Sequence, residues 1–459
     1  MVRILILQFA LVLLLSISLP VQAQSAKVDS CDVTWLWPVP ANAAAADALI
    51  SMDDLKSSDG NPVWSDKAFT ELLAIIDSNA SAVKVSANTS RKIGLLPEFR
   101  NNKAWKIAAV RIDPTAPGGD EKLREQFGEI PQIRLIVQPV TVTAGMVTVH
   151  DFASHVVFSY VTGVDGTKKL PNRDKFKSIL SDVQAIKKLC GDKGVQTTGA
   201  KLGVHPGLVN NAVPEFTAKA KELLQKHLDA SHLSAMAMMG LQNPEPWIFV
   251  ATFQPKPTDP FQALPIPVFT DPGAASPADK IKTAEMLTFR DTPHIQPVPH
   301  TNNRNPATAV LSVLPAQRRG VSTSPLFEAS LNKDASALIG TDAAGQAVFD
   351  AELKNKDLAD WVANPAVSHF FNTDCVSCHT ESQRRTILNL PASSFAFKWP
   401  DGVAPMDPAV AQKQRWNVHN IGWFPDTFGT GMTSATISQR TANETAEVVK
   451  FVNEKYLTP

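Results

Sequence analysis

A surplus of one charge, long apolar segments and internal repeats are all missing from this sequence. Forty-four Lys and Arg residues balance 44 Asp and Glu residues, so the sequence offers no electrostatic attraction for nucleic acid or anionic membranes. After the first 20 residues no stretch approaches 18 apolar residues, so no further membrane span is expected. No repeat of solenoid or propeller length occurs. Residues 24–330 also lack a phosphate-binding glycine pattern and a metal-spaced set of His, Asp and Glu.

Length and composition indicate a folded protein of more than one domain. The chain has 459 residues, of which 44% are hydrophobic and 19% are charged, as in globular proteins. Thirty-four prolines occur, and they recur every few residues in segment 256–315, which predicts an extended linker. The expected organisation is a domain at 24–255, the linker at 256–315 and a second domain at 316–459.

The first 23 residues have the pattern of a signal peptide. Arg3 precedes the apolar run Ile4–Leu19, and Val21–Gln22–Ala23 forms a small-residue cleavage site after Pro20. The run is shorter than a membrane span requires. The mature protein is therefore expected to be soluble and exported, in the periplasm or an equivalent oxidising compartment. A retained N-terminal anchor is the alternative.

The segment 24–255 shows both strand and helix patterns. Runs rich in Val, Ile and aromatic residues predict strands at 105–113, 132–142, 156–161 and 247–253. Apolar residues spaced by three and four predict helices at 67–77, 176–189 and 214–241. An α+β domain is expected. Within the last helix, His227 and His232 with Met236 have a spacing that also suits a copper site, although core packing is the ordinary role of such methionines.

Cysteine is scarce, and two of the four cysteines lie within one pentapeptide. Cys375, Cys378 and His379 form C-x-x-C-H, the attachment signal for a c-type haem. Two thiols at this spacing can form thioethers with the two vinyl groups of one porphyrin, and the adjacent imidazole can then bind the iron. A zinc site would need further ligands, and no second C-x-x-C exists. One covalent haem is therefore predicted on Cys375 and Cys378, with His379 as the proximal ligand.

The residues around this motif extend the pattern. Phe371 precedes Cys375 by four positions, Thr441–Glu444 has the sequence of a capping box, and Phe451 lies on the apolar face of the helix expected there. With these residues the last hundred positions resemble a class I c-type cytochrome. The resemblance implies a mostly α-helical cytochrome c-like domain at 316–459, with its core at about 358–459, in which Phe371 contacts the closing helix. The expected fold class is multidomain, an α+β domain followed by this helical domain.

The second axial ligand of the iron is less determined. Met432 lies in a glycine-rich loop, and its separation from His379 resembles the layout of that family, so Met432 is the predicted ligand. His419, Met406 and an open iron site are the alternatives. Arg415 and Trp416 are predicted to bind a haem propionate, with ordinary aromatic packing as the alternative for the tryptophan.

The remaining two cysteines, Cys31 and Cys190, are predicted to form a disulfide, because the compartment is expected to be oxidising. Two buried thiols are the alternative. The sequence thus predicts an exported monohaem electron carrier whose N-terminal domain docks a partner, either a redox protein or a small-molecule donor. The alternative function is a haem-dependent oxidoreductase, peroxidase-like or with a dehydrogenase N-terminal domain that passes electrons to the cytochrome.

Overall fold

The computed structural model describes residues 27–78, 83–86, 89–91, 95, 97–116, 124–125, 128–166, 168–241, 247–263, 267–269, 287–289, 362–365, 378–379, 381–382, 406–412, 419–425 and 433–457. The predicted signal peptide and most of the predicted linker lie outside these residues, as do Phe371, Cys375, Arg415, Trp416 and Met432. Within the described part, no helix is both long and apolar enough to cross a membrane.

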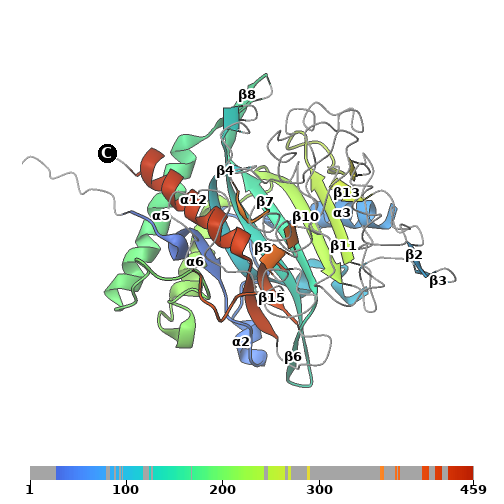
Figure 1. Cartoon of the computed structure of the whole chain (residues 1–459), viewed down its shortest axis with the longest axis horizontal. Coiled ribbons are helices and arrows are strands. Elements are labelled where there is room, and N and C mark those ends of the chain that lie inside the picture. Colours follow the sequence, from blue (N-terminus) through green and yellow to red (C-terminus); the bar gives the residue numbers. More distant parts are fainter. Residues whose placement is uncertain are drawn as a thin grey trace, which may run out of the picture.

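An eight-stranded antiparallel sheet forms the centre of the molecule (Figure 1). Its strand order is β1-β4-β5-β7-β10-β11-β12, and β6 extends the pairing of β5. The strands are β1 (Thr34–Leu36), β4 (Trp105–Ala116), β5 (Ile130–Thr143), β6 (Met146–Val149), β7 (Phe152–Ser159), β10 (Leu233–Leu241), β11 (Trp247–Phe253) and β12 (Gln262–Ala263). Separate two-stranded sheets pair β2 (Val83–Ser86) with β3 (Thr89–Arg91), β8 (Val161–Asp165) with β9 (Lys168–Pro171), and β13 (Pro267–Phe269) with β14 (Leu287–Phe289).

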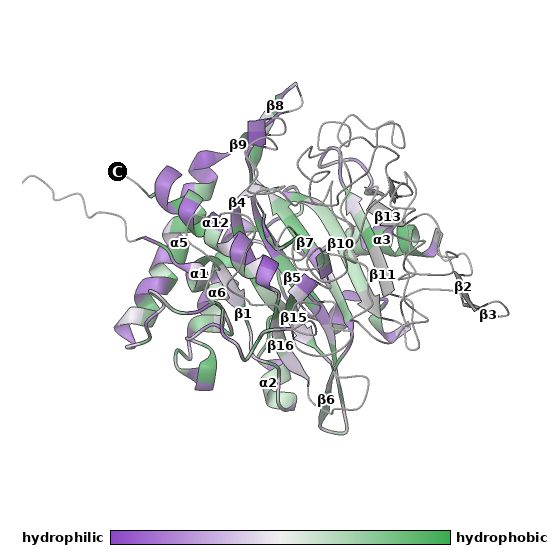
Figure 2. Cartoon of the chain, in the orientation of Figure 1, coloured by the Kyte–Doolittle hydropathy of each residue, from purple (hydrophilic) through white to green (hydrophobic). Residues whose placement is uncertain are grey.

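Three amphipathic helices cover the first face of this sheet. They are α3 (Asp66–Ser78), α5 (Arg173–Asp192) and α6 (Phe216–His227), and their apolar sides join the main hydrophobic core. The side chain of Asn172 caps α5 by accepting a hydrogen bond from the backbone of Lys175. Short elements complete this part: α1 (Ser30–Val33), α2 (Ala43–Asp47), and single turns at Pro97–Phe99, Asn102–Ala104 and Val209–Asn211. Figure 2 shows that β7 and β10 consist mostly of apolar residues, whereas α5 carries both polar and apolar residues.

The second face of the sheet carries its own side chains because successive residues of a strand point to opposite sides. Register places Leu36, Ala109, Ile136, His155, Ala237 and Ala251 side by side in one row across six strands. Leu36, Ala109 and Ile136 form a second core cluster with residues from later in the chain, namely Leu202, Val410, Ile421, Ile437 and Ala442. The C-terminal part of the protein therefore covers this face.

The covering elements are β15 (Ile421–Phe424), β16 (Ser434–Ile437) and α12 (Gln439–Lys455). Figure 1 shows α12 crossing the sheet close to β4 and β5. The strands β15 and β16 pair as an antiparallel hairpin. The predicted fold class, an α+β domain followed by a mostly helical cytochrome-like domain, is therefore wrong. A sheet-rich body instead includes a C-terminal mixture of strands and helix, because α12 buries its apolar side against this body.

The strands predicted from the N-terminal sequence correspond to β4, β5, β7 and β11, and the first two helices correspond to α3 and α5. The helix predicted at 214–241 is wrong beyond His227, since residues 233–241 form strand β10. Met236 and Met238 point into the main core from that strand, and the indole N–H of Trp64 donates to the sulfur of Met236 over 3.2 Å. The helical spacing behind the copper alternative is thus not present.

Candidate haem site

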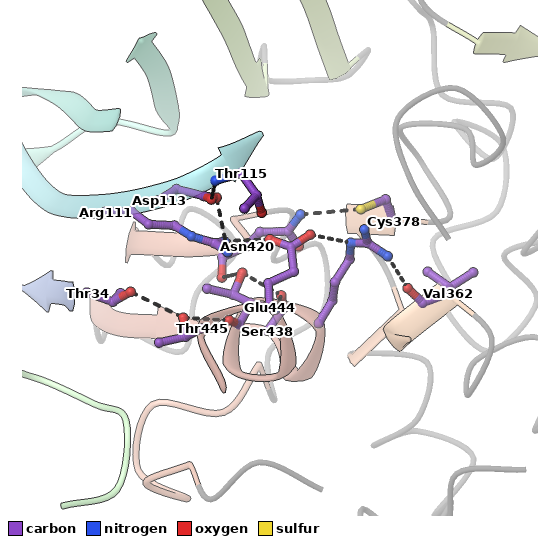
Figure 3. Close-up of polar contacts among 12 residues, drawn as sticks. Thr34, Arg111, Asp113, Thr115, Val362, Cys378, Asn420, Ser438, Glu444 and Thr445 are labelled. Atoms are coloured by element: carbon purple, nitrogen blue, oxygen red, sulfur yellow. Dashed lines mark hydrogen bonds and ion pairs between the residues drawn. The ribbon is translucent and has the colours of Figure 1, made fainter. Parts of the chain in front are cut away.

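Cys378 and His379 lie in a helical turn over the second face, and both are half-buried. The side-chain amide of Asn420 donates to Sγ of Cys378 over 3.7 Å (Figure 3). The carbonyl of Asn420 in turn accepts from the Thr441 hydroxyl over 3.0 Å and from the Ser438 backbone over 2.8 Å. The motif is therefore joined through one residue to the beginning of α12.

The first turns of α12 contact two further short segments near the motif. Ser438 caps this helix, since its Oγ accepts from the backbone of Thr441 over 3.1 Å. Three hydrogen bonds follow: Arg440 Nη1 to the carbonyl of Val362 (2.5 Å), Asn443 Nδ2 to the carbonyl of Ala363 (2.8 Å), and the backbone N–H of Gln439 to Oγ of Ser382 (2.7 Å). The beginning of α12 thus holds together parts of the chain that lie on both sides of Cys378 and His379.

A buried ion-pair network fastens α12 to the sheet. Glu444 accepts from Nη1 of Arg111 on β4 over 2.5 Å and pairs with Nε of Arg440 over 2.9 Å (Figure 3). Arg111 also lies 3.6 Å from a carboxylate oxygen of Asp113. Burial alone would raise the pKa of Glu444, but the charges of Arg111 and Arg440 outweigh it and lower that pKa to about 2. Glu444 is therefore a permanent anion between two guanidinium groups.

His155 on β7 lies in the electrostatic environment of two further imidazoles, those of His379 and His419. Burial lowers the pKa of His155 well below its usual value of 6.5, and the charges of Arg134, His379 and His419 lower it further. Such an effect requires that these groups lie near one another. The buried ring of His419 bonds through Nε2 to Oδ1 of Asp151 over 2.5 Å, and Asp151 immediately precedes β7. His155 is consequently a neutral imidazole at neutral pH, the form that binds iron.

A half-buried guanidinium lies near His155. Arg134 of β5 forms no direct ion pair with a carboxylate of the described residues, and its Nε has no hydrogen-bond partner there. Burial, followed by the charge of Arg111, lowers the pKa of Arg134, while the charges of Asp113 and Glu444 act in the opposite direction. These two carboxylates offset only part of the cost of desolvation, so a further anion close by is favourable.

Small side chains lie beside His155 on one side of the same face. Ala153 precedes it by two positions on β7, and Ala235 and Ala237 lie on the neighbouring strand β10. Next to Ala237 lies Ala251 of β11. On the other side, Ile136 of β5 is the direct neighbour of His155.

These residues fit a haem. The motif supplies a thiol and an imidazole, β7 and the segment before β15 supply two more imidazoles, and Arg134 supplies a charge that suits a propionate. A covalently attached haem needs thiols that form thioethers, nitrogen donors for its iron and a cation near its propionates. No other described group of charged residues combines these features with the motif.

Several predicted site residues cannot be placed, because Cys375, Arg415, Trp416 and Met432 lie outside the described residues. Met406 forms a bridge with Leu202 and packs on the second core cluster. His419 reaches the site but bonds to Asp151.

Sequence reasoning missed His155 and Arg134 as site residues. Their signal was a polar residue at an alternate position of an otherwise apolar strand. That signal says which face a residue occupies but not what covers it.

The two cysteines outside the motif are separate buried thiols, so the structure does not contain the predicted disulfide. Sγ of Cys31 donates to the carbonyl of Lys201 over 3.5 Å. Burial raises the pKa of Cys31 to about 12 and that of Cys190 to about 11. The prediction relied on the compartment alone, whereas the structure accommodates both thiols in the protein interior as protonated, unreactive groups.

Comparisons with protein-family models, with curated proteins and with solved structures found no match.

Proposed function

We propose that this chain is an exported monohaem c-type cytochrome that transfers electrons, built on a sheet-rich body. The haem is attached to Cys375 and Cys378, and His379 is its proximal ligand. The observation that supports the proposal is the contact of Cys378 with Asn420, next to the bonded pair of His419 and Asp151 at the start of β7, the strand that carries His155. The balanced charge of the chain and the signal-peptide pattern agree with an exported carrier.

The residues of the chain divide the work of holding this group. When bound, the haem supplies an iron that alternates between the ferrous and ferric states. His379 donates a nitrogen to one side of that iron, and Asn420 fixes the position of Cys378. Arg134 offsets the charge of a propionate. The network of Arg111, Glu444 and Arg440 holds α12 against the sheet.

Replacement of the motif cysteines tests the proposal. The variant with Cys375→Ala and Cys378→Ala should lose all covalent haem, because no thioether can form. The measurement is acid–acetone extraction followed by haem staining of the denatured polypeptide, after export in a host that attaches haem c. The matched control is the double variant Cys31→Ala and Cys190→Ala, which should keep its haem. Absence of covalent haem from the unaltered protein would overturn the proposal.

The partner is expected to be a redox protein or a small-molecule electron donor, because an electron carrier needs both a source and an acceptor. The prediction that Met432 is the second axial ligand stays a prediction, since Met432 lies outside the described residues.

One observation favours the alternative, a haem-dependent oxidoreductase. The buried pair of Asp151 and His419 is the kind of carboxylate–imidazole pair that moves protons in catalysis. This function requires an open position on the iron. A five-coordinate protein that turns over peroxide would favour it, whereas a six-coordinate low-spin protein would favour the electron carrier.

A further inference from the structure

His155 occupies the middle of the covered sheet face, on β7. Its row places Ile136 on one side and Ala237 on the other. Ile136 belongs to the cluster covered by the C-terminal part of the chain, and Ala237 belongs to the half-buried region beyond it. His155 thus lies at the edge of the area that β15, β16 and α12 cover, next to the small side chains of β10 and β11.

A continuous set of contacts leads from the haem motif to the same strand. Cys378 is bonded to Asn420, the neighbouring residue His419 is bonded to Asp151, and Asp151 begins the series Asp151, Ala153, His155. Residues two apart in a strand share a face. The contact therefore brings the motif to the face, and to the end of the strand, from which His155 projects. The charge of His379 is also among those that lower the pKa of His155.

Two other imidazoles near β7, those of His419 and His150, form side-chain hydrogen bonds with described residues, whereas His155 does not. His419 bonds to Asp151. His150, just before β7, packs against Phe99 with tilted rings whose centroids lie 4.4 Å apart, and it bonds to the hydroxyl of Thr141 over 2.8 Å. Among the described residues, no hydrogen bond to the ring of His155 is formed. A half-buried neutral imidazole without a hydrogen bond needs an explanation.

We propose that His155, from the N-terminal part of the chain, is the axial ligand of the haem iron opposite His379. This inference rests on the proposed function and deepens it. It replaces Met432 with a ligand 224 positions before His379 in the sequence (379 − 155 = 224). The haem then joins the sheet to the C-terminal segment through its iron as well as through packing. Two imidazole ligands also imply a lower reduction potential than the histidine–methionine pair expected from the sequence.

The test uses the full-length exported protein and reports ligation directly. Optical and electron paramagnetic resonance spectra of the unaltered protein should show a low-spin iron with two histidine ligands. His155→Ala should lose this low-spin state and bind carbon monoxide, and added imidazole should restore the low-spin spectrum. His155→Met should stay low-spin but gain the spectrum of a histidine–methionine pair and a higher potential. This second variant keeps a side chain of comparable volume in case the alanine variant does not fold.

His150→Ala is the matched control, because it removes the same residue type from the opposite side of the sheet. It should leave the haem spectrum unchanged. If His155→Ala keeps the original low-spin spectrum while Met432→Ala or His419→Ala loses it, the inference is wrong and the proposed function stands. If the unaltered protein carries no covalent haem, the proposed function fails and the inference fails with it. The haem stain and the spectrum thus separate the two failures.

Discussion

Gly422 is the residue at which the C-terminal hairpin comes closest to the central sheet. Its φ of +135° lies in the region that favours glycine, and a Cβ there would lie 2.3 Å from Oε1 of Gln138. Gln138 cannot move away without loss, because its side chain accepts from the backbone N–H of Trp423 over 2.6 Å and donates to the Trp423 carbonyl over 2.7 Å. One glycine and one glutamine therefore set the distance between β15 and β5.

Gly422→Ala is expected to lower the free energy of unfolding by about 3 kcal/mol. Roughly 1–2 kcal/mol comes from backbone strain, and about 1 kcal/mol from each weakened hydrogen bond of Gln138. Urea denaturation followed by tryptophan fluorescence measures the change. The control is Gly145→Ala, which has a φ of +81° but open space around its Cβ, and should lose only the strain. Equal losses in the two variants would contradict the proposed close contact.

The residues of the candidate site differ in how clearly the sequence indicates them. Cys378 and His379 were found because haem attachment depends on a local spacing. His155 and Arg134 belong to the site only through strand pairing, since Ile136 and Val157 are their partners across the sheet. Long-range register is not contained in local spacing, so one sequence alone could not indicate them as site residues.

At the scale of elements, α12 has more roles than its amphipathic pattern predicted. Its position agrees with the sequence prediction, since Gln439–Lys455 begins close to the expected start at Thr441. However, Glu444 does not complete a capping box, because its carboxylate pairs with Arg111 and Arg440. The strand β10 shows the opposite case, where the local pattern predicted a helix and pairing with β7 and β11 produced a strand.

Glu444→Gln should weaken the attachment of α12. The carboxylate is 25% exposed, and its loss leaves two guanidinium groups without their anion, so a destabilisation of about 2–3 kcal/mol is expected near neutral pH. Because the pKa of Glu444 falls from 4.5 to about 2 on folding, its contribution is complete above pH 4.5 and disappears as the pH falls through 2. Thermal unfolding between pH 6 and pH 2 should therefore show a steeper acid loss in the unaltered protein than in the variant.

The control for this measurement is Glu222→Gln on α6, where the carboxylate forms an exposed pair with Lys219. An exposed pair contributes little, so this variant should follow the pH profile of the unaltered protein. A Glu444→Gln profile that is parallel to the unaltered one would show that the ion pairs with Arg111 and Arg440 do not stabilise the fold.

At the scale of the whole molecule, the described N-terminal and C-terminal residues share their cores. Val448 and Val452 of α12 belong to the main core, and Trp423 of β15 donates its indole N–H to the carbonyl of Trp37 over 2.9 Å. The sequence could predict the individual strands, because each carries its own alternation. It could not predict that the residues after the proline-rich segment would cover the sheet, since their apolar positions also suit a separate helical domain.

The unfolding of the full chain should consequently be one cooperative transition. Shared cores couple the two parts, so neither part should melt alone. Differential scanning calorimetry measures this, and Glu444→Gln should shift the whole transition to lower temperature. Two transitions, of which Glu444→Gln moves only one, would support the organisation in two domains that the sequence predicts.

The closure of α12 over the motif also sets an order of events in biogenesis. Helix α12 follows the motif in the sequence, so the segments on both sides of Cys378 leave the ribosome before the helix that contacts them. Under the proposed function, an enzyme that attaches haem has to reach both thiols of the motif, and that access is greatest before Ser438 and Arg440 make their contacts. The proposal therefore places haem attachment before the docking of α12 on these segments.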